Sequence, residues 1–142
     1  MNEKINKLIP VAMQAIKDSG MFEEDRVPKE FKGYISSMGA SIIQAGLLAT
    51  LAFYANDEGK KAKSSYLLKA IYQVVKGEKA ADKNALIRWV IDSSLRDECR
   101  LNNNNEVGID DMDLDKMYLL EKEIADALVA LKLALRTFKI SE

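Results

Sequence analysis

The apolar residues of this chain recur at the spacing of an α-helix almost throughout, and this periodicity constrains the fold most. It is clearest in the last third, where apolar residues step by three or four positions. These residues are Met117, Leu120, Ile124, Leu128, Leu131, Leu135 and Phe138. The near-heptad spacing predicts one long helix over about 113–139 with an apolar seam that needs a partner helix. In a chain this short we expect that partner within the same chain, although a second copy stays open.

Earlier segments carry the same period. The stripe that starts at Ile5 and ends at Ile16 predicts a helix that stops at Gly20. Pro28 suits the first turn of the next helix. We expect residues 29–55 to form one helix broken near 36–39, or two helices joined there. Shorter helices follow at about 63–76 and 83–100, and the asparagine-rich stretch 102–112 is expected to be a loop.

Composition agrees with a helical domain. Apolar residues make up 48% of the chain and charged residues 30%, as in globular proteins. The chain has only two prolines, fewer than the many turns of a β-rich protein favour. We therefore predict an all-α fold, a compact bundle of five to six helices with a long C-terminal helix. One domain over residues 1–142 is expected at this length.

The most apolar stretch, residues 40–55, is shorter than the roughly 20 residues that a membrane span needs. It is interpreted as a buried core helix, and Gly46 within it is expected to serve close packing. The charged N-terminus has no apolar signal region. With a single cysteine, Cys99, no internal disulfide is possible. A cytoplasmic protein without membrane attachment is expected.

Residues that carry chemistry are scarce. The chain has no histidine and one cysteine, which argues against the usual zinc sites and the commonest general base. The acidic run from Asp110 to Asp115 lacks the glycine and distant glutamate of a calcium loop, so we interpret it as a helix cap. We predict no metal, no cofactor and no enzymatic activity.

Charge is unevenly distributed. Residues 60–100 carry a balance of +5, and the rest of the chain carries −6. The candidates for RNA contact in this basic third are Lys60, Lys61, Lys63, Arg88, Arg96 and Arg100. For the three lysines, phosphate contact and simple solvent exposure both stay open. For the arginines, spaced every four residues with Asp92 among them, an exposed ladder of ion pairs is the favoured interpretation.

Two further features accompany the basic candidates. Lys69, Lys76 and Lys83 recur every seven residues and could extend a phosphate-facing stripe. Trp89 could stack a base, but a core position is the favoured interpretation for a single tryptophan at helical spacing.

The segment YISSMGASIIQAGLLATLAFY, residues 34–54, resembles the small subunit of the type III-B CRISPR effector, the Cmr complex. The last helix, with ALVALKLALRTF, is similar to the closing segment of that family. One departure is Ala45, where that family often has asparagine. The residues that carry the resemblance are Ile42, Ile43, Gly46, Leu47, Leu51, Phe53 and Arg136.

The resemblance implies a non-catalytic subunit. Such subunits stack head to tail beside a filament of larger subunits that holds the guide RNA, and they help line the groove where target RNA pairs with the guide. The implied partners are other Cmr subunits, further copies of this chain, and guide and target RNA.

Alternatives remain from the residues alone. One is a stand-alone helical adaptor or regulator that dimerises through the seam of the last helix. Another is a helix-turn-helix DNA binder built from residues 63–100, which Asp92, Asp97 and Glu98 make less favourable by repelling phosphate. The least favoured alternative is an enzyme whose metal is held by carboxylates alone.

Overall fold

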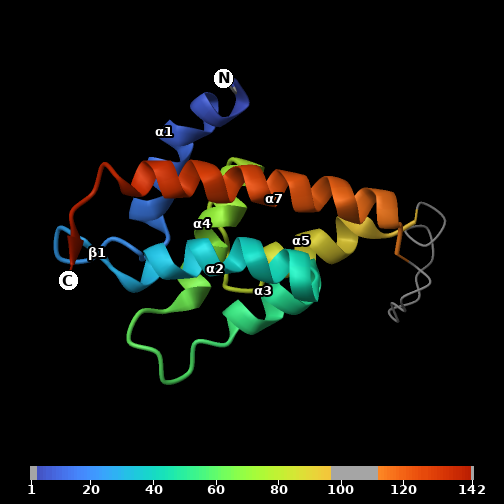
Figure 1. Cartoon of the computed structure of the whole chain (residues 1–142), viewed down its shortest axis with the longest axis horizontal. Helices are drawn as coiled ribbons and strands as arrows, with labels where there is room; N and C mark the ends of the chain where they lie inside the picture. Colours follow the sequence, from blue (N-terminus) through green and yellow to red (C-terminus); the bar gives the residue numbers. More distant parts are fainter. Residues whose placement is uncertain (1–2, 97–111, 142) are drawn as a thin grey trace.

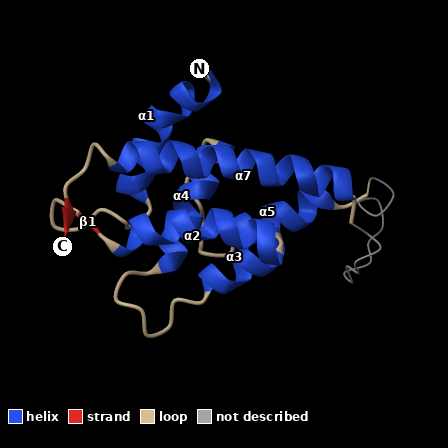
Figure 2. Ribbon diagram, viewed as in Figure 1, coloured by secondary structure: helices blue, strands red, loops and turns tan. Residues whose placement is uncertain are grey.

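The computed structural model describes residues 3–96 and 112–141, and six α-helices form a bundle within them. Figure 1 gives their arrangement, and Figure 2 shows how little strand accompanies them. The helices are α1 (Glu3–Asp18), α2 (Glu30–Ala45), α3 (Leu47–Ala55), α4 (Ser64–Lys76), α5 (Ala85–Ser94) and α7 (Leu114–Leu135). The predicted all-α bundle with a long C-terminal helix is confirmed.

The long helix α7 buries the predicted seam inside the chain. Leu120, Ile124, Leu128, Leu131 and Leu135 are buried against the common core. Helices α1, α2, α4 and α5 all pack against α7. The helix begins at a cap, because the carboxylate of Asp113 accepts backbone N–H groups of Asp115 at 2.9 Å and Lys116 at 3.2 Å. The seam partner is therefore intramolecular.

Helix α4 is the centre of the bundle, since it packs against the other five described helices. Eight of its 13 residues are buried. Gly77, with φ of +74°, ends it in the left-handed conformation that favours glycine. Only a narrow stripe of α4 reaches the surface, and it includes Tyr66, Lys69 and Lys76.

The break predicted near residues 36–39 was wrong, because the chain turns at Gly46. There φ is +93° and ψ is 162°, a backbone region that is essentially restricted to glycine. Helix α2 continues through Gly39 without a break. Its buried stripe of Phe31, Ile35, Met38 and Ile42 extends to both sides of that glycine. A Cβ atom added at Gly46 would meet no other atom within 4 Å, so no neighbour packs closely against this glycine. Its role is thus conformational, and the expected packing role was wrong.

The apolar stretch 40–55 is only half buried, which corrects the expectation of a core helix. Leu47, Leu51 and Tyr54 face the core. The opposite side of α2 and α3 is exposed, with Ile43 at 86% and Phe53 at 67% of their full accessible surface. High apolar content therefore does not mean that every face of this segment is covered.

Three helices also have ends that differ from expectation. Pro28 does not start α2 but lies in β1 (Val27–Pro28), which pairs in parallel with β2 (Ile140–Ser141). Helix α7 stops at Leu135, before the expected end at about 139, and residues 140–141 form the strand that pairs with β1. Helix α5 likewise ends at Ser94, and the expected loop over 102–112 lies almost wholly outside the described residues.

Candidate RNA-facing surface and apolar groove

Lys60 lies against the protein itself. Its ammonium is 5.2 Å from the ring centre of Phe53, 5.5 Å from that of Tyr34 and 5.9 Å from that of Tyr54. It also donates to Ser64 Oγ at 3.1 Å. Cation–π contacts of this kind favour a cation that stays in place. Lys60 therefore anchors the loop between α3 and α4, and the structure gives its charge an intramolecular role.

Lys61 and Lys63, in the same loop, lie in different environments from Lys60. Lys61 is exposed, and Lys63 is half-buried immediately before α4. Ser65 donates a short hydrogen bond to Asp57, which is the main reason that the pKa of this carboxyl lies below its ordinary value. Burial opposes this effect, whereas the positive charges of Lys83 and Lys63 add to it. Lys63 and Lys83 therefore both lie near Asp57, although 20 positions separate them in the sequence.

A second carboxylate extends this neighbourhood to α5. Arg88 donates to Asp82 at 3.0 Å, and this contact is the first cause of a lowered pKa at Asp82. Lys69, on the outer stripe of α4, lowers it further. The loop before α4, the stripe of α4 and the start of α5 therefore share a basic surface with Asp57 and Asp82 as counter-charges.

Aromatic rings are interleaved with these cations. The ammonium of Lys69 lies 5.5 Å from the ring centre of Tyr66, and that of Lys76 lies 5.5 Å from Trp89. Trp89 is half-buried and packs against the core, as favoured from the sequence. We define the basic surface as Lys61, Lys63, Lys69, Lys76, Lys83 and Arg88.

The structure describes only part of the predicted arginine ladder, which therefore stays a prediction. Arg88 pairs with Asp82, six residues before it, and α5 ends before Arg96 is reached. Arg96 is exposed in the segment that follows α5. Arg100 lies outside the described residues.

The family-like residues divide by environment. Ile42, Leu47 and Leu51 are buried, and Gly46 is the turn. Ile43 and Phe53 are exposed, and Arg136 follows the last residue of α7 on the surface. The motif therefore combines core residues with uncovered ones, which packing within this chain does not explain.

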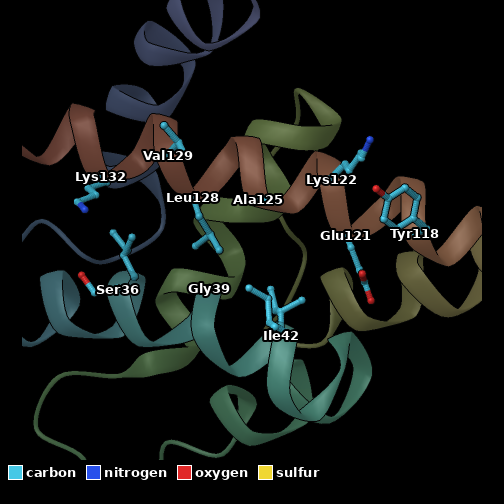
Figure 3. A pocket seen from close by; sticks show the side chains of 12 residues that line it. Ser36, Gly39, Ile42, Tyr118, Glu121, Lys122, Ala125, Leu128, Val129 and Lys132 are labelled. Carbon is cyan, nitrogen blue, oxygen red and sulfur yellow. The ribbon is translucent and has the colours of Figure 1, made fainter. Parts of the chain in front are cut away.

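Sequence reasoning missed an apolar groove of about 450 Å³ between α2 and α7. In Figure 3, Ser36 of α2 lies opposite Lys132 of α7, and Ile42 lies near Glu121, so the two helices run antiparallel along the groove. Ile43, Tyr118 and Val129 line it and are exposed. Tyr118 and Val129 are apolar positions outside the buried seam of α7, and this was the available signal for the groove.

Among the described residues, no group of three or more histidine, cysteine or acidic side chains could hold a metal ion. No helix in the described part of the chain is long and apolar enough to cross a bilayer.

A basic surface and an uncovered apolar groove on a helical bundle are typical of a subunit that binds other macromolecules. Comparison with known families agrees. The family described as CRISPR-associated protein (Cas_Cmr5) matches residues 6–105. The chain belongs to this family, the small subunits of the type III-B CRISPR (Cmr) complex. Comparisons with curated proteins and with solved structures gave no match.

Proposed function

We propose that this protein is a non-catalytic small subunit that stacks in the cytoplasmic Cmr effector complex and helps line the groove where guide RNA pairs with target RNA. Its membership of the Cas_Cmr5 family supports a place among other Cmr subunits. The stacking and the RNA contact go beyond that membership.

The observation that carries the RNA contact is the basic surface. Its cations come from the loop before α4, from α4, from the loop before α5 and from α5. Four of them act on the pKa of Asp57 or Asp82, namely Lys63, Lys69, Lys83 and Arg88. Counterion release makes such a cluster attractive to phosphate, and the interleaved rings of Tyr66 and Trp89 suit contact with nucleotides. Lys60 is not assigned to RNA, because three rings and Ser64 already hold it.

Charge segregation supports stacking. The basic third of the chain carries +5 and the remainder −6, so the acidic part of one copy can approach the basic part of the next. Weak contacts from each copy then add along the filament, as expected for multivalent binding.

Neutralising the basic surface tests the RNA contact. We expect the triple variant Lys61→Gln, Lys63→Gln and Lys83→Gln to weaken target-RNA binding by the assembled complex. Affinity falls as salt rises, and each lost phosphate contact makes the slope of log affinity against log salt shallower by roughly 0.7 to 0.9. The matched control is Lys7→Gln, Lys17→Gln and Lys139→Gln, which removes the same charge from exposed positions elsewhere. Equal slopes for the two variants would contradict the RNA contact.

A further inference from the structure

The groove between α2 and α7 is long and mostly apolar. Tyr118 and Lys132 mark its two ends on α7, about 21 Å apart at 1.5 Å per residue, which is the length of roughly 14 helical residues. Leu128 and Ile42 point into the space between the two helices (Figure 3). Gly39 lies in the wall with nothing within 4 Å of a built Cβ, so a neighbouring backbone can approach closely there.

The charges around the groove are mostly positive. Lys122 and Lys132 line it, and Glu121 is its one acidic lining residue. A smaller hollow beside Lys132 is lined by Lys32 and Arg136. Within the described residues, Lys32, Lys132 and Arg136 form no ion pair. An occupant with acidic side chains would therefore complement this end.

The chain itself offers no suitable occupant among its described residues. Outside the groove, Leu114 lines a neighbouring hollow, and the remaining exposed large apolar residues are Phe53 and Leu119, on different helices. Neither belongs to an exposed apolar stripe of three or four turns. Two copies placed groove against groove would bring two concave surfaces together, and these do not fill each other.

We infer that the groove binds an amphipathic helix of a different, larger subunit of the same complex, with acidic side chains near Lys132. The helix-in-groove mode needs apolar anchors every three or four residues on the guest and an apolar groove on the host. This inference rests on the proposed place in the Cmr complex. It assigns the α2–α7 face to a protein partner, whereas the basic surface is assigned to RNA.

Filling the groove is the first test. Gly39→Leu places a large side chain in the groove wall where nothing else contacts it, and Gly33→Leu does the same in α2 outside the groove. Both variants should stay folded, because leucine favours a helix more than glycine does. When the full chain is co-expressed with the other Cmr subunits, Gly39→Leu should lower recovery of the larger subunits by about tenfold relative to Gly33→Leu.

A photo-crosslinking amino acid at Val129, which is exposed in the groove, identifies the occupant. A crosslink to an acidic amphipathic helix of a larger subunit is the expected result. A crosslink to a second copy, or none in a complex that contains the larger subunits, would overturn the inference. Equal recovery with the two leucine variants would overturn it as well, leaving the proposed function intact. Failure of the unmodified protein to recover any other subunit would overturn both.

Discussion

At the residue scale, the three glycines within residues 29–55 have two different roles. Gly33 and Gly39 are ordinary helical positions with open space around them. Gly46 has a φ of +93° and separates α2 from α3. The sequence allowed the break to be expected in this segment, but it did not reveal which glycine adopts a positive φ.

We expect Gly46→Ala to destabilise the protein by about 1–3 kcal/mol, because a Cβ is strained at this backbone conformation. Gly39→Ala should instead stabilise it by up to about 1 kcal/mol through helix propensity. Urea unfolding followed by circular dichroism measures both. A neutral Gly46→Ala would mean that the turn does not require the glycine conformation.

The second residue-scale prediction concerns Asp57, whose pKa is lowered in the folded protein, chiefly by the hydrogen bond from Ser65. A lowered folded pKa adds stability above the unfolded pKa of about 3.9, and this stability is lost as pH falls through the folded value. Asp57→Asn should thus be less stable than the unmodified protein at pH 7, and the difference should shrink below about pH 4. A difference that stays constant from pH 7 to pH 3 would argue against the ionised carboxylate as its source.

At the element scale, the helices α1, α4 and α7 were predictable because each has an apolar stripe that continues over several turns. The ends were less predictable. Strands β1 and β2 have two residues each, too few for any period, so neither the place of Pro28 nor the early end of α7 had a local signal. The buried seam of α7 was foreseen, whereas the exposure of Ile43 was not, because the whole stretch 40–55 was expected to be buried.

Helix α3 contains a buried hydroxyl that offers a test of its packing. Within the described residues, Thr50 Oγ1 is buried and has no hydrogen-bond partner. Thr50→Val should therefore raise the free energy of unfolding by about 1 kcal/mol, since it removes an unsatisfied polar group and keeps the shape.

Ser64→Ala is the contrasting variant. The Ser64 hydroxyl is also buried, but it donates to the Tyr54 carbonyl at 2.7 Å, and its removal should cost about 1–2 kcal/mol. Thermal unfolding of both variants in parallel decides the point. A destabilised Thr50→Val protein would indicate that the threonine hydroxyl has a partner, such as a bound water.

At the scale of the whole molecule, we propose that two surfaces serve different partners. The basic surface on α4, α5 and the preceding loop is assigned to RNA, and the α2–α7 groove is assigned to a helix of another subunit. The concentration of positive charge was visible in the sequence. Its arrangement around Asp57 and Asp82 was not, because Lys63 and Lys83 are 20 positions apart in the sequence and act together on Asp57 only in the fold. The groove also required the fold, because periodicity identifies an apolar face without saying whether another helix covers it.

We propose above all that this chain works as a stacked small subunit of an RNA-containing Cmr complex. The most direct measurement is affinity purification of the tagged protein from its native host, with native mass spectrometry and RNA sequencing of the recovered particle. We expect larger Cmr subunits, more than one copy of this chain and short guide RNA in the same particle. Recovery of a homodimer without RNA or other subunits would contradict it and would favour the stand-alone adaptor instead.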